Sequence, residues 1–404
     1  MSKRIFVTGY GIVTSIGLGV DENYQSLVHR KSGYGKIDIL ETLHRDDLPA
    51  CEIKLTDNQL CDKAQVPRGK GYTRTSLLGI IAAREAIQMA GLTQPEIVKS
   101  ALLSATTTGG IRELEKYYYE LQDHNQQGEF TAFIDKGNPG EHAEHMAELF
   151  GIRGYIATIS TACSSSANTI MMGAELIKNG VVDVAICGGT EALSKFTLNG
   201  FNTLLILDKQ QCRPFDQTRA GLNLGEGAAF LVLESAESVR RSGKQAMGEV
   251  IGYGNTNDAF HQTASSPEGN GAFHAMQNAL AMSNVLPSAV NYINAHGTAT
   301  ENNDLSEGLA LQKLFSNNVP LFSSTKPYTG HTLAAAGGIE AIFCMLAIQH
   351  DIIFPSLNFS KQMEELTISP VKELMQNIKL KYVLSNSFGF GGNASSLLFA
   401  AVNE

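Results

Sequence analysis

The stretch "ATISTACSSSANTIMMGAELI" (157–177) passes from a β-branched strand through a polar turn into a helix of small residues. A second stretch, "LFSSTKPYTGHTLAAAGGIEAI" (321–342), has the same order of strand, polar turn and small-residue helix. An internal repeat of this length indicates a duplicated architecture. Three further pairs match in the same order along the chain: 6–14 with 250–258, 101–110 with 290–299, and 181–192 with 380–394.

Helical patterns separate the predicted strands. In "TSLLGIIAAREAIQMAG" (75–91) and "GAFHAMQNALAMSNV" (271–285), apolar residues recur every three to four positions. Strands that alternate with helices are typical of α/β proteins. We therefore expect two pseudo-symmetric halves, residues 1–245 and 246–404, with a mostly helical insertion at about 113–150 in the first half.

Composition excludes several classes of protein. The 404 residues are 43% hydrophobic and carry a net charge of −9, which argues against general nucleic-acid binding. The six cysteines are scattered without a CxxC pair, which is typical of free thiols in a reducing cytoplasm. The apolar run 332–349 is interrupted by Gly337, Gly338 and Glu340, so we expect it to be too short and too broken to insert in a membrane.

Cys163 lies where the first quoted strand gives way to its helix. The backbone N–H groups and dipole of a helix that starts beneath the sulfur would favour the thiolate, which is the nucleophilic form. A buried and inert thiol is an equally good reading of this stretch alone. The other five cysteines lack this context, and we expect them to be structural.

Two histidines lie in turns of the second half. His331 follows the strand that matches the one before Cys163, and His296 follows the preceding predicted strand. A two-fold relation between the halves would bring these turns to one pocket, where a cysteine and two histidines form an acyl-transfer arrangement. His142 and His145 have HxxH spacing, but a solvated helix face is the better prediction, and we expect no metal site.

Four ordered blocks, "TACSSS", "NAHGTAT", "STKPYTGH…AAAG" and "NSFGFGGNAS", resemble the signatures of the β-ketoacyl-acyl-carrier-protein synthases. The resemblance covers nearly the whole chain and is greatest to the elongating branch, which uses one cysteine and two histidines. It implies a thiolase-like fold with α-β-α-β-α layers. It also implies decarboxylative condensation of an acyl group with malonyl-acyl carrier protein. The enzyme would need no cofactor, because the carrier protein brings the phosphopantetheine, and it would form a homodimer or a heterodimer.

The resemblance also implies roles for residues around the sulfur. Cys163 would accept the acyl chain, and His296 and His331 would stabilise the enolate that decarboxylation leaves. Lys326 would order the network around His331, with Glu340 as its partner.

Two further blocks would bind the substrates. Thr298 and Thr300 would hold the pantetheine arm, and Thr108 would line an acyl tunnel near a dimer interface. In the "FGFGG" block the gating ring would be Phe390, whose backbone N–H would join that of Cys163 in an oxyanion hole. Phe388, Gly389 and Gly391 of this block would also contact the substrate.

Three residues depart from the usual pattern of this family: Pro327 after Lys326, Thr332 after His331, and Asn393 directly after the glycines. They leave the catalytic atoms in place but favour a specialised lipid, polyene or polyketide pathway over primary fatty-acid synthesis.

Other classes remain as alternatives. A non-catalytic subunit of the chain-length-factor type usually lacks the cysteine, and a thiolase needs a second cysteine near the C-terminus. The initiating synthases have asparagine in place of the second histidine. A cysteine hydrolase would need a base that activates water, and none is indicated.

Overall fold

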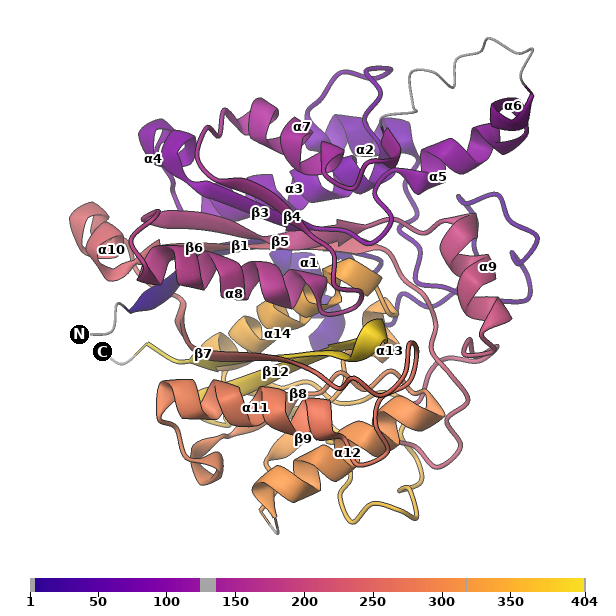
Figure 1. The fold of residues 1–404 in the computed structure, drawn as a ribbon, viewed down its shortest axis with the longest axis vertical. Coiled ribbons are helices and arrows are strands. Elements are labelled where there is room, and N and C mark those ends of the chain that lie inside the picture. The colour runs from indigo at the N-terminus through magenta and orange to yellow at the C-terminus, as the bar shows by residue number, and fades with distance from the viewer. Residues whose placement is uncertain (1–3, 124–135, 317, 403–404) are drawn as a thin grey trace.

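The computed structural model describes residues 4–123, 136–316 and 318–402, and it contains one large mixed sheet (Figure 1). The first half of the chain contributes strands in the order β4-β3-β5-β6-β1, and the second half continues with β7-β13-β12-β8-β9. The strands of the first half are β1 (Ile5–Thr14), β3 (Ala101–Ala105), β4 (Ile156–Ile159), β5 (Val184–Glu191) and β6 (Gly227–Ser235). Those of the second half are β7 (Gly248–Asn257), β8 (Tyr292–Asn294), β9 (Leu321–Ser323), β12 (Tyr382–Gly389) and β13 (Asn393–Ala400).

The two halves have the same strand directions. In the first half β3 is parallel to β4 and β5, and β6 is antiparallel to both β5 and β1. In the second half β8 is parallel to β9 and β12, and β13 is antiparallel to both β12 and β7. The halves join through a short antiparallel pairing of β1 with β7, at Phe6 with Glu249 and Val7 with Gly248. The predicted duplication is confirmed, strand by strand.

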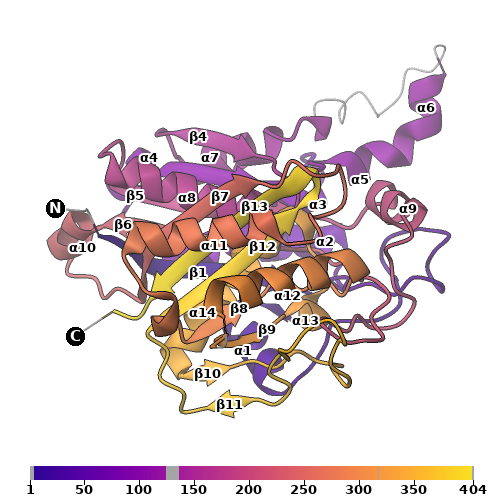
Figure 2. The same cartoon turned by 60° about the horizontal axis from the view of Figure 1, so that its bottom comes forward.

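Helices form three layers around these strands. The helices α8 (Ser165–Lys178) and α14 (Ala336–His350) lie between the two half-sheets. The outer faces are covered by α3 (Arg74–Met89) and α7 (Glu141–Phe150) on one side, and by α11 (Asn270–Ser283) and α12 (Glu301–Phe315) on the other. Figure 2 shows α11 and α12 lying over the strands of the second half. The expected α-β-α-β-α layers are therefore present.

Small residues allow the middle layer to form. A Cβ on Gly337 of α14 would lie 2.9 Å from the backbone nitrogen of Ala167 in α8, so the close approach of these helices needs glycine. Almost every side chain of α14 is buried, as expected for a helix packed on all sides. The helical stretch Leu333–His350 is long and apolar enough to cross a membrane, contrary to expectation, but 89% of it is buried inside the protein.

Shorter elements complete the described chain. They are β2 (Gly17–Leu18), α1 (Val20–Val28), α2 (Asp57–Ala64), α4 (Gln94–Lys99), α5 (Ile111–Leu114), α6 (Tyr118–Gln122), α9 (Lys195–Thr203), α10 (Ala236–Ser242), α13 (Lys326–Thr329), β10 (Ile352–Ile353) and β11 (Met375–Gln376). Helices α5, α6 and α7 lie wholly or partly in the predicted insertion, while its residues 124–135 lie outside the described part of the chain.

Candidate active site

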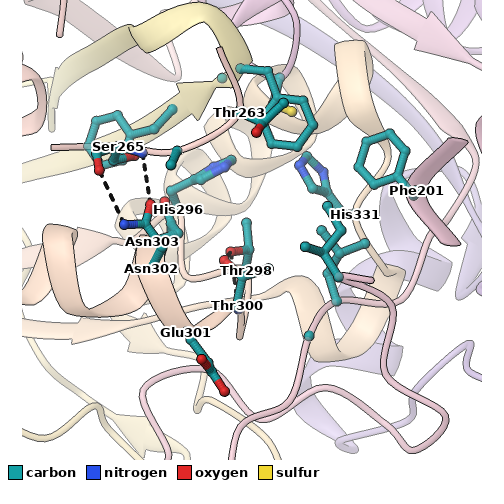
Figure 3. Close-up of a pocket in the computed structure, with 18 of the residues that line it drawn as sticks. Phe201, Thr263, Ser265, His296, Thr298, Thr300, Glu301, Asn302, Asn303 and His331 are labelled. Carbon is teal, nitrogen blue, oxygen red and sulfur yellow. Dashed lines mark hydrogen bonds between the residues drawn. The ribbon is translucent and has the colours of Figure 1, made fainter. Parts of the chain in front are cut away.

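Two cavities meet at Cys163. One, of about 310 Å³, is lined by His296, His331, Thr298 and Thr300, and we call it the histidine cavity (Figure 3). The other, of about 640 Å³, we call the threonine cavity; its lining includes Thr107, Thr108, Thr197, Thr203 and Leu333. Three residues line both cavities: Cys163, Phe201 and Phe390. The sulfur-bearing residue therefore lies at the junction of two separate spaces.

A strained turn presents Cys163. Ala162 has φ of 52°, a left-handed conformation that a non-glycine residue seldom adopts, and α8 begins at Ser165. The Cys163 side chain is only 5% exposed. Burial raises its pKa to about 12, although the Lys326 charge and a hydrogen bond from the Phe390 backbone act to lower it. Burial outweighs these contributions and favours the neutral thiol in the free protein.

His296 is held through its backbone by Glu307 and through its ring by Lys326. The Glu307 carboxylate accepts hydrogen bonds from the backbone N–H groups of His296, at 2.9 Å, and Gly297, at 2.8 Å. The Lys326 ammonium lies 3.2 Å from Nδ1 of the His296 ring. Since an ammonium group can only donate, Nδ1 is the acceptor and the ring proton is on Nε2.

His331 is held by extended backbone. Its N–H donates to the Asn223 carbonyl at 2.8 Å, and its carbonyl accepts from the Gly225 N–H at 3.0 Å. The Leu333 N–H donates to Nδ1 of the His331 ring at 3.3 Å, which again leaves the ring proton on Nε2. The "GLNLGEG" segment (221–227) thus positions the second histidine from the first half of the chain.

The two rings are neutral donors. They meet edge to face, with centroids 5.3 Å apart. Burial, followed by the positive charge of Lys326, lowers the pKa of both histidines well below the ordinary value of 6.5. Each ring can therefore offer an Nε2–H to one oxygen atom in the histidine cavity.

The hydrogen bonds of Lys326 differ in part from the expectation. Its ammonium group pairs with the Glu340 carboxylate on α14, as predicted. Its hydrogen bonds to a histidine, however, go to the ring and carbonyl of His296 rather than to His331. The prediction was wrong about this contact, because Lys326 makes its hydrogen bonds to His296. The charge of Lys326 still acts on His331 by lowering its pKa.

Phe390 lies between the two cavities. Its ring stacks on that of Phe201 with centroids 5.7 Å apart. Gly391 beside it has φ of 79°, a conformation that favours glycine. Gly389 lies against the sulfur-bearing turn, since a Cβ there would be 2.9 Å from the Cys163 nitrogen. The structure thus places Phe390 and both glycines where the sequence predicts a gate.

The remaining predicted residues line the same spaces. The Thr298 and Thr300 hydroxyls are 2.9 Å apart in the histidine cavity, and the Phe388 ring packs 5.7 Å from that of His296. Thr108 lines the threonine cavity, but its hydroxyl donates to the Glu191 carboxylate at 2.8 Å. This hydrogen bond engages the Thr108 hydroxyl within the protein, while the residue lines the cavity as predicted.

Two of the three unusual residues fit their positions without disruption. Pro327 lies in the first turn of α13, where a helix has no use for the missing N–H. The Asn393 amide donates to the Phe390 carbonyl at 3.1 Å and so anchors the turn that carries the gating ring. Nothing in the structure explains Thr332.

The HxxH pair is not a solvated face. His142 is buried, with Nδ1 2.7 Å from the Pro139 carbonyl and Nε2 2.6 Å from the Ser104 hydroxyl. The expectation for His142 was therefore wrong, because α7 packs against the sheet. Among the residues that the structure describes, no group of three or more potential metal ligands is found.

Two acidic residues that support the site were not predicted from the sequence. Glu191 and Glu307 are buried and accept hydrogen bonds from the cavity turns. Phe201, the stacking partner of Phe390, was also missed. The strand end at Glu191 was visible in the sequence, but its burial was not.

Comparisons with known proteins agree with this geometry. Residues 2–239 match the model of the β-ketoacyl synthase N-terminal domain, and residues 247–360 match that of the β-ketoacyl synthase C-terminal domain. The chain belongs to the β-ketoacyl synthase family. The expected activity, that of a condensing acyltransferase, is confirmed at this level.

Individual relatives cover nearly the whole chain. A 3-oxoacyl-[acyl-carrier-protein] synthase 2 of Staphylococcus aureus (strain COL) is 33% identical, with 98% of each protein aligned. The protein of the same name from Synechocystis is also 33% identical, again over 98% of each. The solved ishigamide ketosynthase/chain length factor is 29% identical with a TM-score of 0.92 over all of both chains. A β-ketoacyl synthase from Burkholderia phymatum is 28% identical with a TM-score of 0.88, over 99% of this chain and 100% of that one.

Proposed function

We propose that this protein condenses an acyl group held on Cys163 with a malonyl unit brought by an acyl carrier protein, with loss of carbon dioxide. The main support for this proposal is the position of Cys163 at the junction of the two cavities. The acyl chain would occupy the threonine cavity, and the malonyl thioester would enter the histidine cavity. The names of the Staphylococcus and Synechocystis relatives support the same reaction.

The first step loads the acyl chain. The Cys163 sulfur attacks the acyl thioester, and the departing pantetheine sulfur takes the proton. The positive charge of Lys326 and the hydrogen bond from the Phe390 backbone stabilise the thiolate as it forms, since both lower the pKa of Cys163.

The second step releases carbon dioxide from the malonyl group. The Nε2–H groups of His296 and His331 donate to the malonyl thioester oxygen and stabilise the enolate that forms as the C–C bond breaks. Neutral imidazoles suit this role, because they keep a ring proton to donate.

The third step forms the new bond. The enolate carbon attacks the acyl-Cys163 carbonyl, and the backbone N–H groups of Cys163 and Phe390 donate hydrogen bonds to the negatively charged oxygen that forms. The intermediate collapses, the 3-oxoacyl product stays on the carrier protein, and the Cys163 thiolate takes a proton from water. We propose that these steps need no bound cofactor and no metal ion.

Exposed basic side chains and a solved relative support the proposed partners. The exposed side chains of Arg68, Lys70 and Lys209 are candidates for binding an acidic carrier protein. One solved relative is a ketosynthase of Xenorhabdus doucetiae in complex with its chain length factor; it is 28% identical to this chain with a TM-score of 0.83, over 99% of this chain and 98% of that one.

A dimer fits the exposed apolar side chains. Strand β4 ends the strand order, and both Tyr155, just before it, and Ile156, its first residue, are exposed. The outer wall of the threonine cavity also exposes Phe196 and Leu204. We propose that a second subunit, identical or homologous, covers both regions in the cytoplasm.

Chain length would depend on the threonine cavity. Thr108 is smaller than leucine or isoleucine, so the cavity should accept medium or long acyl chains, including unsaturated ones, in preference to acetyl. Thr108→Phe is expected to lower turnover of long chains by roughly 10- to 200-fold relative to short ones. This preference suits a specialised lipid, polyene or polyketide pathway.

The test is product formation from purified components. Wild-type protein is incubated with acyl- and malonyl-carrier proteins, and the carrier is analysed by mass spectrometry for a 3-oxoacyl chain two carbons longer. Release of one carbon dioxide per product supports the proposal. A protein that forms no product alone but does so with a homologous subunit supports the heterodimer. Product formation that persists in Cys163→Ala would instead favour a non-catalytic, chain-length-factor-like role for this chain.

A further inference from the structure

The Glu191 carboxylate accepts six hydrogen bonds from two turns near the site. It lies at the end of β5 and is almost fully buried. Five of its hydrogen bonds come from the turn after β3, where it accepts from the hydroxyls of Thr106, Thr107 and Thr108 and from the backbone N–H groups of Thr107 and Thr108. A sixth comes from the backbone N–H of Ala334, at 3.3 Å.

These contacts connect two regions that are far apart in sequence. Thr107 and Thr108 line the threonine cavity. Ala334 follows Leu333, whose N–H donates to the ring of His331 at 3.3 Å. Leu333 itself lines the threonine cavity and has φ of 49°, so its backbone depends on its neighbours to hold a strained conformation.

We propose that Glu191 is a positioning residue through which the wall of the threonine cavity acts on His331. An acyl chain that fills the cavity contacts Thr108 and Leu333, and the shared carboxylate passes their displacement to the turn that orients the His331 ring. Release of carbon dioxide would then be fast only when an acyl acceptor is already in place. This inference rests on the proposed function, because it takes the threonine cavity as the acyl site.

Such a link would protect the malonyl substrate. Decarboxylation without an acceptor would waste the malonyl unit, since the enolate would only take up a proton. A histidine whose orientation depends on the filled cavity would limit this loss. The proposal therefore concerns the ratio of two rates: carbon dioxide release in the first turnover by acyl-loaded enzyme, and by free enzyme.

The test uses variants at both ends of the link. Thr108→Val keeps the shape of the side chain but removes its hydrogen bond to Glu191, while Thr108→Ser keeps the hydroxyl and removes the methyl group. Glu191→Gln keeps the size of the side chain but replaces an acceptor oxygen with a donor. Thr203→Val makes the same change as Thr108→Val at a cavity residue whose hydroxyl bonds to the Asn199 carbonyl instead.

Loss of the Thr108 hydrogen bond to a carboxylate is expected to lower the ratio by about tenfold in Thr108→Val. Glu191→Gln should lower it at least as much, and Thr108→Ser and Thr203→Val should keep the wild-type ratio. Thermal unfolding and the extent of acyl loading show whether each variant is folded. If Glu191→Gln does not fold, the rate ratios of Thr108→Val and Thr108→Ser are compared instead, and they test the link on their own.

Failure of the link through Glu191 and failure of the proposed function would give different results. If folded and loaded Thr108→Val keeps the wild-type ratio, or if Thr203→Val lowers it equally, the link through Glu191 is wrong while the proposed function stands. If the wild-type protein, both alone and with a homologous subunit, neither loads an acyl group nor releases carbon dioxide, the proposed function itself is wrong.

Discussion

The rings of His296 and His331 meet edge to face 5.3 Å apart, and each has its Nδ1 engaged by a donor from the protein. Both therefore offer their Nε2–H groups to the same space. We expect His296→Ala and His331→Ala each to slow carbon dioxide release from malonyl-carrier protein by about 100- to 1,000-fold, as for loss of one oxyanion donor.

Loading should survive both histidine substitutions, because the step uses the Cys163 sulfur and the Phe390 backbone. The measurement pairs radiolabelled carbon dioxide release with the intact mass of the acyl-enzyme. Variants that lose loading but still release carbon dioxide would reverse these roles.

The Lys326 charge should set the acid limit of the reaction. Because burial, followed by this charge, lowers the pKa of both histidines, the wild-type rate of carbon dioxide release should stay level as the pH falls from 8 to below 6.5. Lys326→Met removes the charge and raises both pKa values, so its rate should begin to fall at a higher pH. Glu340→Gln keeps the charge and serves as the control. An acid limit that is the same in Lys326→Met and wild type would remove Lys326 from this role.

Gly389 should be required for acyl transfer because of its closeness to Cys163. Its φ of −124° suits any residue, but a Cβ would lie 2.9 Å from the Cys163 nitrogen and 3.0 Å from the Thr161 carbonyl oxygen. Gly389→Ala should therefore block the proposed oxyanion hole and slow condensation by about 100- to 1,000-fold.

Malonyl decarboxylation should be affected far less in this variant, since it depends on the histidines. Gly35→Ala, where a Cβ would meet nothing within 4 Å, is the matched control. Equal losses of condensation and decarboxylation in Gly389→Ala would indicate general distortion rather than a blocked oxyanion hole.

Glu307 should make stability depend on pH. Burial raises the pKa of Glu307 to about 7 from an ordinary 4.5. The folded protein therefore holds a proton that the unfolded chain releases between these values, and this stabilisation, complete below about pH 4.5, is lost as the pH rises through 7. Relative to Glu307→Gln, the wild-type protein should lose roughly 3 kcal/mol of unfolding free energy across this range. Urea titrations at pH 5 and pH 8 measure it, and a difference that stays constant with pH would contradict the protonation argument.

The repeated order of strand, turn and helix predicted the fold well. The matching of 157–177 with 321–342 depends on local patterns of small and β-branched residues, and these survive as β4–α8 and β9–α14. The two histidines and Cys163 could be placed together because strand ends at equivalent positions of a duplicated sheet converge. These features needed only the order of residues along the chain.

Other features depend on side-chain direction and on burial by distant segments. Lys326 lies near both histidine turns, and only the folded chain shows that its hydrogen bonds go to His296. The raised pKa of Cys163 has the same kind of cause, because many segments together exclude water from the sulfur. The sequence does not show that the fold buries Glu191 and Glu307.

In the proposed reaction Cys163 holds the acyl chain at the junction of the two cavities. The most direct measurement is the intact mass of the protein, with peptide mapping, after incubation with a panel of acyl-carrier proteins. We predict one acyl group per chain, located on Cys163, and none on Cys163→Ala. An acyl group on another residue, or an equal yield on Cys163→Ala, would show that Cys163 is not the acyl carrier.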